Sequence, residues 1–203
     1  MHNNDVSRIT ERIQEMEKAS SAGRLILAVD GRCAAGKTTL AARLQEQLGC
    51  TVFHMDDFFL RPEQRTEARY RQPGGNVDYE RFREEVLLPL YRGADSVTYR
   101  PFDCKSQTLQ APVQLRSGRV NLVEGAYSCH PELTEFYDLR IFLDITGEEQ
   151  MERIKKRNGE NAATVFAAKW IPLEELYFKT FDIRNSCDMC VGSCHEMTAH
   201  EKS

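Results

Sequence analysis

The feature that most restricts the fold of this 203-residue chain is the sequence GRCAAGKT at residues 31–38. It fits the pattern G-x-x-x-x-G-K-[ST], in which glycines let the backbone wrap around phosphate and successive N–H groups point at the anion. A short apolar run, residues 25–29, precedes the motif, and helix-forming residues, 40–44, follow it. Because the motif requires a strand before it and a helix after it, we predict a loop that binds the phosphates of a nucleotide, and not a glycine-rich turn without a ligand.

Two residues of this loop have a specific expected task. We expect Lys37 to reach the outer phosphates of ATP and to take part in catalysis, and the Thr38 hydroxyl to ligate Mg²⁺. Cys33 is more simply explained as a small filler of the loop than as a nucleophile. The predicted nucleotide-binding residues are Gly31, Arg32, Cys33, Ala34, Ala35, Gly36, Lys37, Thr38 and Thr39.

Short apolar runs alternate with helical patterns along the rest of the chain. The runs are at residues 51–55, 120–123, 139–143 and 187–191, and the helical patterns are at 5–20, 79–88, 148–157 and 162–181. This alternation predicts an α/β protein with a three-layer P-loop NTPase fold, a mostly parallel sheet and a small lid. Residues 61–77 have no apolar period and predict a loop or flap, residues 97–115 an inserted β-ribbon, and residues 131–137 a short helix.

We expect a single domain over residues 1–203. It begins with a helical segment at residues 1–22, carries the lid at about 148–160, and ends in a frayed tail at 192–203. The long helix at 162–181 is expected to bend at residues 171–172, because Pro172 lacks a backbone N–H.

Charge and cysteine content restrict the environment and the partners. The net charge of −4 and the pI of about 5.8 argue against nucleic acid as the main partner. The apolar residues occur in short runs, so we expect no membrane span, and the N-terminus lacks a signal pattern. An odd count of seven cysteines indicates free thiols and a cytoplasmic location. A small molecule is therefore the expected partner.

Charged residues at the ends of the predicted strands supply candidates for phosphoryl transfer. Asp56 follows the strand at 51–55 and is placed to act as a base, and Glu124 ends another strand, where a carboxylate would hold Mg²⁺. Arg153 and Arg157 are one helical turn apart and are expected to bind the transferred phosphate. The simpler alternatives are a turn cap for Asp56 or Asp57, a buried turn carboxylate for Glu124, and a solvated face for the arginines.

Several motifs together resemble the uridine kinase family of P-loop nucleoside kinases, which belongs with phosphoribulokinase. They are GRCAAGKTT, MDDFF, VDYERF, EGAYS and a late cationic helix, over residues 25–191. The resemblance implies ATP-dependent transfer of the γ-phosphate, with Mg²⁺, to the 5′-hydroxyl of a ribonucleoside such as uridine or cytidine. It also implies that Asp56, and not Asp57, is the general base and that Glu124 is the Mg²⁺-associated carboxylate.

The same resemblance implies the acceptor-side residues. Asp78 matches the aspartate that holds the ribose hydroxyls, Phe102-Asp103 matches a motif beside the base, and Arg153 and Arg157 match the lid arginines. The chain departs from the family in three respects: Tyr79-Glu80 replaces a usual His-Pro-Asp run, no histidine accompanies Phe102, and the lid is short. A nicotinamide riboside kinase-like activity, or that of another small-alcohol kinase, is therefore an alternative.

Other readings stay open at this point. A P-loop ATPase or GTPase switch would have no acceptor, although no guanine motif N-K-x-D is found, and a further alternative is a nucleotide-binding module without catalysis. Cys187, Cys190, Cys194 and His195 have metal-like spacing, although a strand would turn Cys187 and Cys190 to opposite faces. Trp170 lies at helical spacing from Phe166, Leu173 and Tyr177, which predicts a core-facing stripe or, alternatively, a substrate wall.

Overall fold

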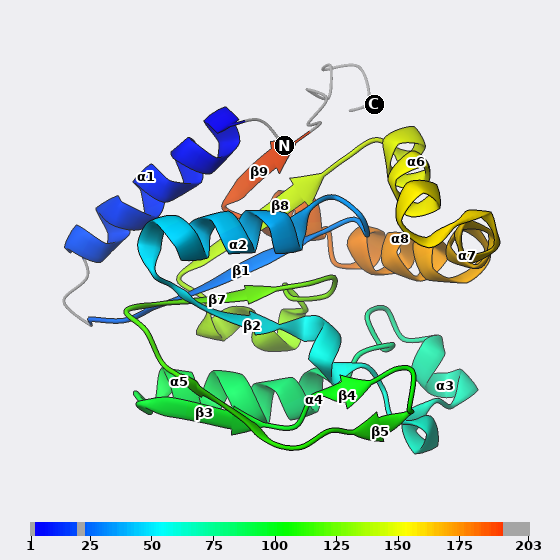
Figure 1. The fold of residues 1–203 in the computed structure, drawn as a ribbon, viewed down its shortest axis with the longest axis horizontal. Coiled ribbons are helices and arrows are strands. Elements are labelled where there is room, and N and C mark those ends of the chain that lie inside the picture. Colours follow the sequence, from blue (N-terminus) through cyan, green and yellow to red (C-terminus); the bar gives the residue numbers. More distant parts are fainter. Residues whose placement is uncertain (1–2, 20–22, 193–203) are drawn as a thin grey trace.

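The computed structural model describes residues 3–19 and 23–192, and a five-stranded parallel sheet forms its centre (Figure 1). The strand order is β2-β7-β1-β8-β9, and every neighbouring pair is parallel. The bounds are Thr51–His54, Val120–Glu124, Leu25–Gly31, Leu139–Asp144 and Met189–Gly192 in that order. All residues of β1 and β7 are buried, as expected for strands that are covered on both faces. The predicted α/β fold with a parallel sheet is confirmed.

Helices on both faces of the sheet make three layers. Leu25, Leu27 and Val29 of β1 share one apolar cluster with α1 (Asn3–Ala19) and α2 (Lys37–Leu48). Ile26 and Ala28 point to the other face and belong to a second cluster, which includes residues of α8 (Ile171–Thr180) and of the helix at 79–91. This alternation follows from the two-residue period of a strand. It places the expected N-terminal helix and phosphate-loop helix on the same face.

Two long helices contain a π turn next to a proline. The helix at 79–91 runs through α4 (Tyr79–Phe82), the π segment η3 (Arg83–Leu87) and α5 (Leu88–Tyr91), which contains Pro89. In the lid region, α7 (Glu160–Val165) continues through the π segment η5 (Phe166–Trp170) into α8, which contains Pro172. Because proline removes one intrahelical hydrogen bond, a widened turn is a common local solution. The predicted break at residues 171–172 therefore takes the form of a π turn.

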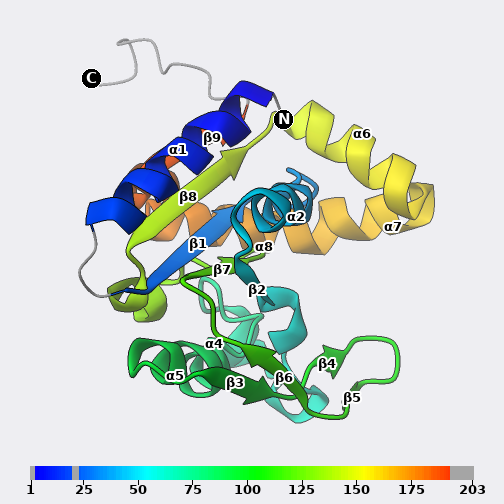
Figure 2. The same ribbon diagram turned by 60° about the vertical axis from the view of Figure 1, so that its left-hand side comes forward.

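The expected β-ribbon is present as two antiparallel pairs. Strand β3 (Ser96–Tyr99) pairs with β6 (Val113–Arg116), and β4 (Phe102–Asp103) pairs with β5 (Thr108–Leu109). Figure 2 shows both pairs on the same side of the sheet as α4 and α5. The prediction of a structureless flap at 61–77 was wrong in part, because the segment holds η2 (Pro62–Gln64) and α3 (Glu67–Tyr70). Thr66 caps α3 through its side chain, a local signal that needs no apolar period.

The remaining elements are short, apart from one lid helix. They are η1 (Met55–Phe58), η4 (Pro131–Phe136), α6 (Gly147–Asn158) and α9 (Ile183–Ser186). In Figure 1, α6 and α7 lie to the right of the sheet, and α3 lies below them. No helix of the described ranges is long and apolar enough to cross a membrane. The tail expected at 192–203 lies, from residue 193 onward, outside the described residues.

Candidate active site

A cavity of about 810 Å³ opens where β1, β2 and β7 end, between the phosphate loop, the flap and the lid. Ligands of open parallel sheets bind beyond these carboxyl ends. The cavity brings together most of the residues that the sequence predicts for catalysis, nucleotide binding and metal binding: Cys33, Ala34, Gly36, Lys37, Thr38, Thr39, Asp56, Glu124, Arg153 and Arg157. Gly31, Arg32 and Ala35 belong to the same loop but do not line the cavity.

The phosphate loop has the backbone that its glycines require. A Cβ atom at Gly31, whose φ is +138°, would lie 2.1 Å from the carbonyl oxygen of Leu143 on the neighbouring strand, so only glycine fits. Helix α2 begins at Lys37, and its N-terminus faces the cavity. The Lys37 ammonium donates to the carbonyl oxygens of Gly31 at 2.7 Å and Arg32 at 2.9 Å. A cation and a helix N-terminus therefore face the same space, as phosphate binding requires.

Next to the loop, Thr38 and Glu124 provide oxygen ligands. The Thr38 hydroxyl lies 3.3 Å from both carboxylate oxygens of Glu124, and Glu124 is buried. His54 Nδ1 lies 2.6 Å from Glu124 Oε1, and this hydrogen bond raises the pKa of His54. No group of three or more His, Cys, Asp or Glu residues is arranged as a metal cage within residues 3–19 and 23–192. Mg²⁺ binds through one or two protein oxygens together with substrate phosphates, so the hydroxyl and carboxylate fit this ion.

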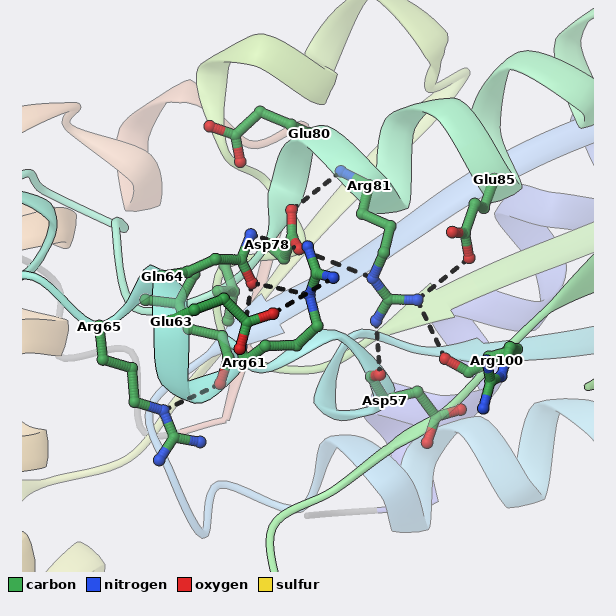
Figure 3. A network of polar contacts seen from close by, with 12 residues as sticks. Asp57, Arg61, Glu63, Gln64, Arg65, Asp78, Glu80, Arg81, Glu85 and Arg100 are labelled. Carbon is green, nitrogen blue, oxygen red and sulfur yellow. Dashed lines mark hydrogen bonds and ion pairs between the residues drawn. The ribbon is translucent and has the colours of Figure 1, made fainter. Parts of the chain in front are cut away.

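The two adjacent aspartates after β2 have different surroundings. Asp56 is exposed to the cavity, whereas Asp57 Oδ2 accepts a hydrogen bond of 2.8 Å from the Tyr99 hydroxyl. The backbone carbonyl of Asp57 accepts from Arg81 Nη2 at 3.1 Å (Figure 3). Partial removal from water raises the pKa of Asp56, and Glu124 and Asp57 raise it further against the opposing effect of Lys37. Asp57 is thus held by the protein, and Asp56 is available to a ligand.

Gly125, directly after Glu124, allows the ends of β7 and β2 to approach each other. Its φ is +141°, and a Cβ atom there would lie 2.7 Å from Met55 Cβ and 3.5 Å from Asp56 Oδ1. Any larger residue would push the turn that carries Asp56 away from Glu124. The close approach of the two strand ends therefore explains why glycine follows Glu124 in the sequence.

Arg153 and Arg157 of α6 reach the phosphate loop from the lid. Arg153 Nη1 donates to the carbonyl oxygens of Ala34 at 3.1 Å and Ala35 at 3.2 Å, and the guanidinium pairs with Glu149. Arg157 Nη2 lies 3.6 Å from Cys33 Sγ. Both side chains line the cavity, although Arg157 is also exposed, so a role on the transferred phosphate stays a prediction.

Two buried carboxyl groups that lie beside the phosphate loop were not predicted from the sequence. Glu174 of α8 accepts the Cys33 backbone N–H at 3.1 and 3.2 Å and lines the cavity, and burial raises its pKa. Asp30 accepts four hydrogen bonds, three from backbone N–H groups and one of 2.7 Å from the Tyr177 hydroxyl, and burial raises its pKa as well. A carboxylate at the end of a buried strand was a usable signal for Asp30. Nothing in the spacing of the helix marks Glu174.

The three predicted acceptor residues do not line the cavity. Asp78 is buried, accepts from Arg81 N as the cap of α4, and accepts from Gln64 Nε2 at 2.8 Å (Figure 3). Phe102 is buried, and Asp103 is held in its own turn by the backbone N–H groups of residues 105 and 106. The flap and the ribbon instead contribute Phe59, Leu60, Arg65, Tyr70, Asn76, Cys104 and Gln107 to the cavity.

The prediction that Trp170 packs in the core was wrong. Trp170 and Phe166 are partly exposed and line the cavity, whereas Tyr177 of the following helix is fully buried. The part of the helix before Leu173 lies outside the core. Its residues Phe166 and Trp170 therefore face the cavity instead of the sheet. This observation supports the alternative of a substrate wall.

Two members of the predicted cysteine cluster, Cys187 and Cys190, lie within the described residues, so the alternative of a metal site stays untested. Cys187 precedes β9, and its Sγ lies 3.8 Å from Cys129 Sγ, while Cys190 lies within the strand. Cys194 and His195 lie outside the described residues.

Comparison with known proteins finds similar kinases. No family model matches the chain. The chain is 28% identical over 193 residues to the bifunctional α-galactosidase/sucrose kinase AgaSK of Mediterraneibacter gnavus, and 24% identical over 145 residues to uridine-cytidine kinase C of Dictyostelium discoideum. These matches cover 84% and 71% of this chain but only 20% and 32% of the two relatives. The chain therefore spans a third or less of each relative's length.

Solved structures have the same fold. A possible uridine kinase from Bacillus stearothermophilus superimposes with a TM-score of 0.70 at 22% identity, over 93% of this chain and 98% of that one. A proposed fructose transport system kinase from Silicibacter sp. TM1040 gives 0.68 at 23% identity, over 92% and 98%. Both structures show that the chain has the fold of P-loop kinases. The predicted resemblance to the uridine kinase-like P-loop kinases is confirmed.

Proposed function

We propose that this protein is an ATP-dependent kinase that transfers the γ-phosphoryl group to the 5′-hydroxyl of a ribonucleoside such as uridine or cytidine. The observation that carries the proposal is the placement of Asp56. Its carboxylate faces the cavity that holds Lys37, Thr38 and Glu124, whereas the adjacent Asp57 is bound by Tyr99. An ATPase switch has no need of a second carboxylate that is free to take the proton of an alcohol.

On the donor side, the Lys37 ammonium and the backbone N–H groups of the 31–39 loop that do not donate within the protein would bind the phosphates of ATP. Lys37 would exchange its contacts with the loop carbonyls for contacts with phosphate oxygens. Thr38 and Glu124 would hold Mg²⁺, which neutralises the phosphate charge when it is bound. Glu174 would keep the loop in place through the Cys33 N–H.

On the acceptor side, Asp56 would remove the hydroxyl proton while the oxygen attacks the γ-phosphorus. The new P–O bond forms as the bond to the β,γ-bridging oxygen breaks, and ADP leaves. Arg153 and Arg157 would stabilise the charge that spreads over the transferred group. We further propose that residues 148–160 act as a lid within a single domain, since both arginines belong to it.

Aromatic side chains support a nucleoside as the acceptor. Phe59, Tyr70, Phe166 and Trp170 line the cavity and offer ring faces to a base. The match to uridine-cytidine kinase C points the same way. A contact between Asp78 and the ribose stays a prediction, and it requires Gln64 to release the carboxylate.

A sugar hydroxyl is the second candidate acceptor. The withdrawal of Asp78 from the cavity favours it, because the expected ribose clamp is occupied by Gln64 and Arg81. Asn76 and Gln107 supply neutral polar groups to the wall instead, and the match to a sucrose kinase is consistent with such an acceptor.

Acceptor-dependent release of ADP tests the proposal. Purified protein with MgATP is assayed alone and with uridine, cytidine, nicotinamide riboside, sucrose, fructose or pantothenate, and the Lys37→Met variant serves as the control for contaminating kinases. We expect rapid release only when a nucleoside is present. Release with a sugar alone would support the second candidate, acceptor-independent release would indicate a switch, and no release at all would indicate a binding module.

A further inference from the structure

Arg65 is unusual among the arginines of the flap and the helix that follows it. Arg61, Arg69, Arg71 and Arg81 each form an ion pair with a carboxylate. Arg65 forms none with any residue in the described ranges, although it lies in the middle of this charged segment. In Figure 3 its guanidinium points away from the network around Asp78, and it lines the cavity.

Neutral groups hold the Arg65 side chain in place. Nε donates to the carbonyl oxygen of Leu60 at 2.9 Å, Nη1 donates to Gln107 Oε1 at 2.5 Å, and the guanidinium lies over the Phe102 ring at 5.5 Å. The amide nitrogen of Gln107 donates to the carbonyl oxygen of Cys104, which fixes the amide so that its oxygen faces Arg65. Gln107 itself has a φ of +59°, an uncommon conformation for a residue with a side chain.

These contacts leave part of the guanidinium unused. Nη2 has no hydrogen-bond partner among residues 3–19 and 23–192, and one N–H of Nη1 is also free. The carboxylates of the cavity are engaged elsewhere or assigned to chemistry: Glu124 contacts Thr38 and His54, Glu174 accepts from the loop, and Asp56 faces the acceptor. The unused N–H groups of Arg65 are therefore available to a ligand in the cavity.

A second cation without a carboxylate partner enters the cavity from the lid. Lys169 Nζ lies 4.9 Å from the centre of the Tyr70 ring and 4.5 Å from that of Trp170. No ion pair of Lys169 is found within the described ranges. Since Tyr70 belongs to α3 of the flap, the lid and the flap meet at this contact on the acceptor side.

We propose that Arg65, supported by Gln107, selects the acceptor by binding an oxygen-bearing edge of it. Two parallel N–H groups of a guanidinium fit carbonyl or anionic oxygens, and they bind isolated hydroxyl groups less well. This inference rests on the proposed kinase activity and narrows the acceptor to a nucleobase-bearing or acidic alcohol. A sugar that offers only hydroxyl groups is disfavoured.

Substitution of Arg65 tests the inference. Arg65→Met removes the charge and the N–H groups, Arg65→Lys keeps the charge without the fork, and Arg71→Met is the matched control, because Arg71 is exposed, pairs with Glu67 and lies outside the cavity. The KM and kcat of wild type and variants are measured with uridine (carbonyl oxygens), pantothenate (carboxylate) and sucrose (hydroxyl groups only), and the KM of ATP is measured in parallel. Thermal unfolding verifies that each variant is folded.

We expect Arg65→Met to lower kcat/KM for the preferred acceptor by roughly 10- to 150-fold, the effect of losing a hydrogen bond to a charged group, mostly through KM. Compared with Arg65→Met, Arg65→Lys should recover part of the lost kcat/KM if the preferred acceptor is pantothenate. It should recover little of it if the preferred acceptor is uridine. The KM of ATP should stay within about twofold, and activity on sucrose, where detectable, should be unchanged.

Equal losses on all acceptors, or an unchanged acceptor KM in both Arg65 variants, would overturn the inference while leaving the kinase proposal intact. Preference of the wild type for sucrose would also overturn it. If the wild type phosphorylates none of the compounds, the proposed function fails instead. Calorimetric titration of uridine and pantothenate into wild type and Arg65→Met then decides the subsite: weaker binding to the variant supports it, and equal or absent binding refutes it.

Discussion

Replacing Asp56 by asparagine keeps the shape of the side chain but removes the oxygen that would take the acceptor proton. The adjacent Asp57→Asn variant is a matched control, because the same chemical change is made one residue further along. Asp57 is bound by the Tyr99 hydroxyl and does not line the cavity. The structure therefore predicts opposite outcomes for two neighbouring and chemically identical substitutions.

General base catalysis contributes about 10²- to 10⁴-fold to a rate, which corresponds to roughly 3–5 kcal/mol of the activation barrier. We expect Asp56→Asn to lose kcat to this extent with little change in the KM of ATP. Asp57→Asn keeps an oxygen for Tyr99, and its loss should stay below about tenfold.

The pH profile provides an independent readout. Because partial burial raises the pKa of Asp56, the acidic limb of kcat/KM should lie above the ordinary value of 3.8. The Asp57 charge contributes to this rise, so Asp57→Asn should move the limb to lower pH, and Asp56→Asn should abolish it.

Steady-state release of ADP with the preferred acceptor, measured from acidic to neutral pH, decides between the two aspartates. Equal losses in both variants would mean that the acidic turn acts only as a structural unit. A larger loss for Asp57→Asn, or near wild-type turnover of Asp56→Asn, would refute the assignment of the base.

Two further predictions concern the acids and bases around the loop. Asp30→Asn would place an amide nitrogen against one of the donors that now face the carboxylate. We expect the free energy of unfolding, measured by denaturant titration, to fall by about 1–3 kcal/mol. The control Asp95→Asn, at an exposed residue, should change it by less than about 0.5 kcal/mol. A stability like that of Asp95→Asn would disprove the role of this network. Since hydrogen bonding to Glu124 raises the pKa of His54, its contribution to stability is full below pH 6.5 and is lost as pH rises through the raised value. His54→Gln should flatten the pH dependence of unfolding over that window, and an unchanged dependence would contradict this reasoning.

Local patterns sufficed to predict the sheet and the donor side of the site. The phosphate loop, Asp56 and Glu124 each follow an apolar strand, and parallel strands bring their carboxyl ends together without any further information. The acceptor side depends on packing that no local pattern encodes. Asp78 caps α4 as the motif suggests, but its carboxylate is also bound by Arg81 of the same motif and by Gln64 from outside it. The position of Trp170 also depends on packing. The π turn and the part of its helix that lies outside the core bring Trp170 into the cavity.

One residue that holds the phosphate loop from the far end of the chain was not predictable for a related reason. Glu174 accepts the Cys33 N–H over a sequence separation of 141 residues, and nothing in the spacing of its helix marks it. Arg153 was predicted as a phosphate-binding residue, but its bonds to the carbonyl oxygens of the loop were not. Only the three-dimensional arrangement makes Glu174 a buried acceptor for the Cys33 N–H. Arg65 was not predictable either, since it differs from its neighbours in lacking a carboxylate partner among the described residues.

The bonds from Arg153 and Glu174 to the phosphate loop have a thermodynamic consequence. Helices α6 and α8 are both attached to the peptide groups of residues 33–35, so opening of the proposed lid, α6, includes the rupture of the Arg153 bonds. A nucleotide that favours the closed position of α6 lowers the population of the open lid, and by linkage an acceptor that closes the lid tightens nucleotide binding by the same factor. We therefore expect the nucleotide and the acceptor to bind synergistically. Amide hydrogen exchange in α6 should slow when a nucleotide occupies the phosphate loop, although the loop belongs to another part of the chain.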